Sequence, residues 1–192
     1  MVVTASRPIT FLLSDRVATM DDRMPFPSSW TVRRALDAYL TENGFTEAAY
    51  EADWTQASFL GVRFAVPNTR RHRWAIRLHD LHHVATGYGS DLAGEGEISA
   101  WEVHDARALG PYVGTIVVSG LVAGMMLAPR RTLAALRIGR AHRRLFALAS
   151  ESAQYESLLS MTVGELRELL GMRHTGLAER PRGLHAFAPG RA

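Results

Sequence analysis

Apolar residues recur at helical spacing through most of the chain, and this pattern predicts its elements. After Ser29, which can cap a helix, apolar residues share one helical face until Gly44, where we expect the helix to end. The stretch TEAAYEADW predicts a second short helix that begins at Thr46. In GVRFAVPN, large apolar residues alternate with smaller or charged ones, which predicts a short extended segment that Pro67 ends.

A longer helix with a regular apolar face follows. We expect Thr69 to cap this helix and Gly87 to end it. Residues 87–94 hold three glycines and predict a loop. The next helix is expected over residues 95–109, with Gly110 as its stop.

The last third of the chain also predicts helices. No residue from Ala108 to Pro129 is charged, and the stretch that follows is rich in arginine at helical spacing. In TVGELRELLG, Thr162 and Glu165 form a capping box, and Gly171 closes the helix.

These elements predict an all-α fold, a single compact multi-helix domain. A chain of 192 residues fits one domain of ordinary size. Residues 1–28, with three prolines, predict an irregular lead-in. We expect the helical domain over residues 29–171 and a loosely ordered tail over residues 172–192.

Composition narrows the chemistry that this domain can carry. The chain has no cysteine, so a metal would need nitrogen and oxygen ligands. The net charge is only +3 and no recognition motif is present, so we expect no nucleic-acid partner. The N-terminal apolar run ITFLL is too brief for a secretory signal, which favours a cytoplasmic location.

The uncharged stretch over residues 108–129 has two interpretations. It is long enough for a membrane span, which needs ~20 apolar residues, and Gly120 and Gly124 form a GxxxG pair. Its other glycines, its hydroxyls and the lack of a second such stretch favour a buried core helix instead. Small residues would let another helix or a lipid chain approach its backbone, and an exposed apolar helix would favour a homodimer.

The arginine-rich stretch also has two interpretations. Arg130, Arg137, Arg140 and Arg144 recur near helical spacing. They form either an ordinary solvated face or an amphipathic surface that meets anionic lipid headgroups or a ligand phosphate. The second interpretation places the protein peripherally at the inner face of the cell membrane, with Arg137 or Arg140 on an anionic group of a ligand.

Candidate metal ligands concentrate in HDLHHVATGYGSDLAGEGE, residues 79–97. His79 and His83 lie one turn apart on the predicted helix, so both imidazoles can reach one ion. Asp80 is adjacent and can bind the ion or orient an imidazole, and Glu95 returns after the loop at the start of the next helix. Two imidazoles with one or two carboxylates suit zinc, non-haem iron or manganese, and leave room for water or substrate.

Two further residues are alternates in this ligand set. His82 lies three residues after His79, and Glu97 lies two residues after Glu95. A two-residue shift turns a helical side chain by ~200°, so Glu95 and Glu97 are not expected to serve the same ion.

Other site classes compete for the same histidines. HxxHH is the histidine box of membrane di-iron hydroxylases, which need further boxes and several spanning helices. The pair His79–Asp80 occurs in HD-type phosphohydrolases, for which His72 and Asp105 would be the remaining ligands. A helix with solvated or hydrogen-bonded histidines needs no metal, but four ligands at suitable spacing favour one.

The order His79-Asp80-x-x-His83, eleven residues, Glu95 resembles the metal-ligand motif of the coenzyme Q biosynthesis protein four family. The surrounding HHVATGYGSDLAGE is similar to its TGYG-type loop and Gly-Glu helix start. RIGRAHRRL and MTVGELRELLGM resemble its Gly-Arg helix and its closing helix. The resemblance covers roughly residues 62–172.

The resemblance implies a helical protein that carries one divalent metal, usually zinc, on His79, Asp80, His83 and Glu95. It also implies action on, or presentation of, the isoprenoid benzenoid precursor of ubiquinone. The family is associated with removal of the ring carboxyl, with hydroxylation at the same carbon, and with holding quinone-pathway enzymes together at the membrane.

These observations lead to three hypotheses. The first is a metal-dependent enzyme of the decarboxylase, hydroxylase or lyase type, with an apolar tunnel for a prenylated or otherwise lipophilic aromatic substrate. The second is a lipid-binding scaffold with a structural metal that delivers a quinone precursor to partner enzymes. The third is a protein recruited to a specialised-metabolite pathway.

Overall fold

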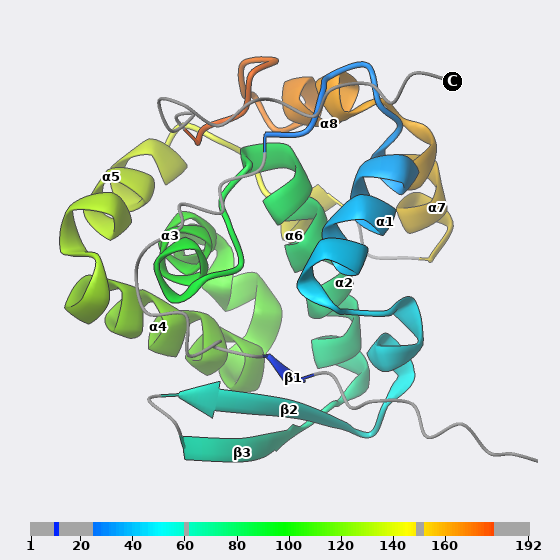
Figure 1. Ribbon diagram of the computed structural model, residues 1–192. Coiled ribbons are helices and arrows are strands. Elements are labelled where there is room, and N and C mark those ends of the chain that lie inside the picture. The colour runs from blue at the N-terminus through cyan, green and yellow to red at the C-terminus, as the bar shows by residue number, and fades with distance from the viewer. Residues whose placement is uncertain (1–9, 12–24, 60–61, 149–151, 179–192) are drawn as a thin grey trace, which may run out of the picture.

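The computed structural model describes residues 10–11, 25–59, 62–148 and 152–178 (Figure 1). Helices dominate this part of the chain, which confirms the predicted all-α class, and one small sheet is added to them. Most of the expected lead-in and most of the expected tail lie outside the described residues.

The first helix, α1 (Val32–Asn43), begins two residues later than expected. Thr31 is its N-cap and accepts a hydrogen bond from the amide of Arg34, so the predicted cap at Ser29 is wrong. A cap needs an extended backbone whose side chain reaches the third following amide, and Thr31 supplies both. Gly44 ends the helix in the left-handed region, with φ of 70°, as predicted.

A small sheet replaces part of the second predicted helix. The helical turn η1 (Glu47–Glu51) is followed by strand β2 (Trp54–Phe59), which pairs antiparallel with β3 (Val62–Pro67). Strand β1 (Thr10–Phe11) pairs parallel with the other side of β2. The extended segment at β3 was predicted, but its backbone groups need a partner strand, and β2 provides it.

Helix α2 (Arg70–Thr86) has the predicted boundaries. The Thr69 side chain accepts a hydrogen bond from the amide of His72, and Gly87 adopts φ of 79° at the other end. Helix α3 (Leu92–Glu102) begins three residues earlier than expected, because Asp91 caps it through the amide of Gly94. The helical turn η2 (Val103–Leu109) follows it.

Helix α4 (Gly110–Leu127) folds back along α3 as an antiparallel hairpin. A Cβ on Gly96 would lie 2.4 Å from the Cα of Gly124, and a Cβ on Gly120 would lie 2.1 Å from the Ser99 hydroxyl. The backbones therefore touch where side chains are small, as the GxxxG pair predicts.

The outer side of α4 is exposed, so the prediction of a buried core helix is wrong. Val118, Val122 and Met126 are all exposed large apolar residues on this helix. The stretch Leu92–Leu127 is apolar and long enough to cross a membrane, and only 28% of its most apolar window is buried. The hairpin buries only one side of α4 because α3 is its main partner.

The remaining helices complete two groups around α2. Helix α5 (Pro129–Gly139) packs on α3 and α4, and the short α6 (Leu145–Leu148) contacts α2 and η2. Helices α7 (Ser152–Ser160) and α8 (Val163–Leu169) pack beside α1, and α8 also contacts α2 (Figure 1). Thr162 and Glu165 form the predicted capping box of α8.

The core lies between these groups and continues into the expected tail. Leu78, Leu81 and Trp101 are wholly buried in it. Met172 is also buried, and the amides of Leu177 and Ala178 donate to the carbonyl of Thr86. The described part of the expected tail is thus held by the burial of Met172 and by the hydrogen bonds of Leu177 and Ala178 to α2.

Candidate metal centre

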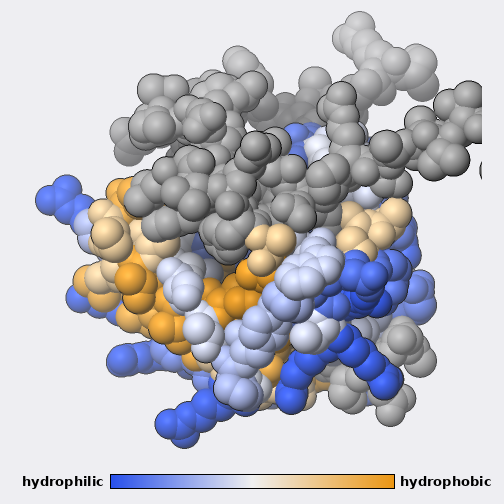
Figure 2. All heavy atoms as spheres, turned by 90° about the horizontal axis from the view of Figure 1, so that it is seen from below, coloured by the Kyte–Doolittle hydropathy of each residue, from blue (hydrophilic) through white to orange (hydrophobic). Residues whose placement is uncertain are grey.

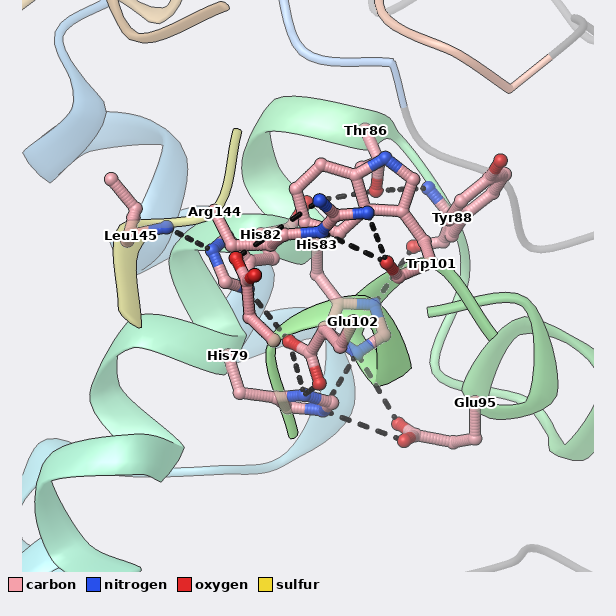
Figure 3. A network of polar contacts seen from close by, with 11 residues as sticks. His79, His82, His83, Thr86, Tyr88, Glu95, Trp101, Glu102, Arg144 and Leu145 are labelled. Carbon is pink, nitrogen blue, oxygen red and sulfur yellow. Dashed lines mark hydrogen bonds and ion pairs between the residues drawn. The ribbon is translucent and has the colours of Figure 1, made fainter. Parts of the chain in front are cut away.

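Three side chains from α2 and α3 converge on one point (Figure 3). His79 and His83 lie one turn apart on α2, and their Nε2 atoms are 3.1 Å from each other. Glu95, in the first turn of α3, places one carboxylate oxygen 3.5 Å from each of these nitrogens. The structure therefore brings together three of the four ligands expected from the sequence.

The hydrogen bonds behind the two imidazoles fix where their protons lie. His83 Nδ1 is 3.0 Å from the carbonyl oxygen of Tyr88, which can only accept, so Nδ1 carries the proton. His79 Nδ1 is 3.0 Å from both carboxylate oxygens of Glu102, so it donates as well. With the proton on Nδ1, the Nε2 atom of each neutral imidazole has a lone pair available for a metal ion.

A cation between three electron-pair donors that face one another would offset their mutual repulsion. Glu95 Oε1 is buried and has no hydrogen-bond partner in the described part of the chain. Ligands placed about 2.0–2.1 Å from a tetrahedral ion stand about 3.4 Å from each other. The separations of 3.1–3.5 Å match this geometry, so the group fits a divalent metal ion.

The pKa values of these groups reflect the same crowding. Burial alone would lower the pKa of His79, but Glu102 and Glu95 outweigh it and raise this pKa well above its usual value. Burial alone would raise the pKa of Glu95 and Glu102, yet the histidines that face them hold both at about 2. Two ionised carboxylates balance the charge of one divalent cation.

Asp80 does not belong to the converging group. Its carboxylate accepts a hydrogen bond from the hydroxyl of Tyr50, on η1. Burial raises the pKa of Asp80 to about 6, although His79 and the Tyr50 hydrogen bond oppose the shift. The Asp80 side chain therefore points toward η1, where it is a partner of Tyr50, and not toward the three converging ligands.

The alternates His82 and Glu97 have other partners. His82 is fully buried, with Nδ1 2.6 Å from Glu102 and Nε2 2.9 Å from the amide nitrogen of Leu145. Glu97 forms a two-point ion pair with Arg131, at 2.7 and 3.1 Å. Neither side chain is directed at the ion site.

Glu102 was not predicted from the sequence. It lies seven residues, about two helical turns, after Glu95, and therefore on the same side of α3. This spacing could have indicated Glu102 from the sequence. It is a weak indication by itself, because acidic residues at helical spacing are common in proteins.

A cavity of 660 Å³ adjoins the metal group between α2, α3 and α4. His79, Glu95 and Glu102 lie on its wall, whereas most of the wall is apolar, including Val113, Val117, Val118, Val122 and Met126. His83 is fully buried, but His79 and Glu95 have 16% and 19% of their side chains exposed. The open side of the ion site therefore faces the cavity.

The structure separates the other candidates from this centre. His72 lines the cavity without joining the metal group, and Asp105 lies 4.0 Å from Arg144. Both side chains needed for an HD-type site are thus elsewhere. Arg137 and Arg140 are exposed on or just after α5 and are not among the cavity-lining residues.

Comparison with family models, with curated proteins and with solved structures finds no match to this chain.

Proposed function

We propose that the protein is a metal-dependent enzyme that acts on a lipophilic aromatic substrate, a prenylated quinone precursor in the first instance. The observation that supports this proposal is a group of metal ligands whose open side faces a large apolar cavity. Two histidines and one carboxylate with an open position are typical of catalytic zinc and of non-haem iron sites. The motif's resemblance to the coenzyme Q biosynthesis protein four family suggests zinc and the substrate class.

Each residue of the site has a distinct task in this proposal. His79, His83 and Glu95 would hold the ion, which would supply Lewis-acid polarisation of a ring carboxylate or carbonyl. The apolar wall from Val113 to Met126 would orient the hydrocarbon part of the substrate and exclude water. Release of the ring carboxyl as carbon dioxide and hydroxylation of the same carbon, with dioxygen as the oxidant, is the reaction type that the resemblance favours.

The exposed side of α4 supports a peripheral position at a membrane. Val118, Val122 and Met126 are exposed and also line the cavity, so the cavity reaches the surface there. Figure 2 views the molecule from below and shows hydrophobic residues gathered over part of this side, with hydrophilic residues projecting at its margins. A lipophilic substrate would enter the cavity from the acyl chains without crossing water.

Metal content tests the first part of the proposal. We expect one divalent ion per chain in protein purified without added metal, measured by elemental analysis. His79→Ala and His83→Ala should lose the ion and keep the helical circular dichroism. His104→Ala, a control on η2 outside the group, should keep it. Full metal occupancy in both ligand variants would overturn the assignment.

Turnover and lipid capture test the second part. Val117 is buried in the cavity wall, so Val117→Phe should fill the space and weaken turnover of a carboxylated prenyl-phenol while metal content stays unchanged. Co-purified lipid without turnover at full zinc, iron or manganese loading would overturn the enzyme in favour of a scaffold.

A further inference from the structure

One buried carboxylate joins the candidate metal ligand His79 to a second histidine. Only 1% of the Glu102 side chain is exposed. Each of its carboxylate oxygens lies 3.0 Å from His79 Nδ1 and can accept a hydrogen bond from it. Glu102 Oε1 also accepts a hydrogen bond from His82 Nδ1, at 2.6 Å. Both contacts are visible in Figure 3, where Glu102 lies between the two rings.

The proton on His82 is fixed from the far side of the ring. The amide of Leu145 donates to His82 Nε2 at 2.9 Å, and a backbone N–H cannot accept. Nε2 must therefore be unprotonated, and the single proton of a neutral ring must lie on Nδ1, facing Glu102.

Glu102 also determines which nitrogen of His79 carries the proton. With His82 donating to Glu102, the carboxylate has only acceptor capacity left, and His79 meets it with a donating Nδ1. The Nε2 lone pair of His79 is thereby held toward Glu95 and His83. The His82 end of this hydrogen-bonded path is enclosed by protein, because His82 packs edge-on against Trp101 and Phe146, with ring centroids at 5.0 and 4.8 Å.

We propose that Glu102 is the positioning residue of the metal centre and that the Leu145 amide, His82 and Glu102 together set the tautomer of His79. This inference rests on the proposed metal site, but it requires no particular reaction. Its role is indirect, because Glu102 acts on the ion through His79. Outer carboxylates of this kind commonly change metal affinity by about 10- to 100-fold.

Glu102→Gln tests the inference with little change of shape. The amide offers one acceptor where two imidazole donors compete, so we expect the zinc dissociation constant, measured by chelator competition, to rise about 10- to 100-fold. Spectra of ¹⁵N-histidine-labelled protein should show that His82 or His79 no longer has a fixed Nδ1–H tautomer. Glu97→Gln removes another buried carboxylate from α3 and should leave both readouts as in the wild type.

A second variant keeps the test decisive if Glu102→Gln does not fold. His82→Phe preserves the aromatic packing and removes the link to Leu145, so we expect several-fold weaker zinc binding. Wild-type zinc affinity and an unchanged His79 tautomer in either folded variant would overturn the inference. Absence of turnover in wild-type protein would count against the proposed enzyme alone, because neither readout involves catalysis.

Discussion

Asp80 shows what the spacing of residues in the sequence can and cannot predict about a metal site. On spacing alone it stood beside His79 as a candidate ligand, and the family resemblance gave it the same role. A helical neighbour points about 100° away, however, and Asp80 faces Tyr50. Spacing found His79, His83 and Glu95 because their places depend on one helix and one short loop. Glu102 and His82 depend on contacts with α3 and with Leu145 that no local pattern contains.

The partnership of Asp80 with Tyr50 gives a prediction at the residue scale. Asp80→Asn should keep the metal ion, measured by elemental analysis, whereas Glu95→Gln should lose it. Asp80→Asn should also lower the free energy of unfolding by about 1–3 kcal/mol, because it disturbs a buried hydrogen bond. Tyr50→Phe is the matched control and should destabilise without metal loss. Loss of the ion from Asp80→Asn would restore Asp80 as a ligand.

At the element scale, helices α3 and α4 approach each other closely at Gly96 and Gly124. The GxxxG pair predicted close approach, but the sequence did not identify α3 as the partner, because Gly96 and Ser99 are only opposite once the chain turns at η2. The early start of α3 was also missed, since the glycines of the preceding segment concealed the cap at Asp91. Strand β2 was missed because the predicted helix over TEAAYEADW ran to Trp54, the residue at which the strand begins.

The same contact predicts the effect of adding one methyl group. Gly96→Ala should force α3 from α4 and lower the free energy of unfolding by about 1–3 kcal/mol in urea titrations. Since Glu95 is the adjacent residue, zinc affinity should fall as well. Ala134→Ser, on the exposed side of α5, is a control that should change neither quantity. Wild-type stability in Gly96→Ala would contradict the close approach of the two backbones.

At the scale of the whole molecule, the exposed apolar side of α4 borders the arginine-rich helix α5. Helix α4 presents Val122 and Met126, and α5 begins immediately afterwards with exposed Arg130. The sequence predicted arginines at helical spacing but left open whether they form a solvated face or a lipid-binding one. An apolar side with basic residues at its border favours anionic bilayers.

Vesicle binding tests this arrangement. Val122→Glu and Met126→Glu should reduce co-sedimentation with vesicles that contain phosphatidylserine, and added salt should weaken the remaining binding. Leu148→Glu, at an exposed apolar residue of α6, should leave binding unchanged. Equal binding of the wild type and both α4 variants would remove the membrane from the proposal, while the metal centre would be unaffected.

The amide of Leu145 offers a way to observe the metal from a distance. Its proton is held by a ring that lies 63 residues earlier in the chain and that reaches the ion site through Glu102. Metal binding should stabilise the hydrogen bonds from the Leu145 amide through His82 to Glu102. The exchange of the Leu145 amide proton with deuterated solvent should therefore slow. Mass spectrometry of the deuterium content of the segment around Leu145 would then report metal occupancy without a substrate.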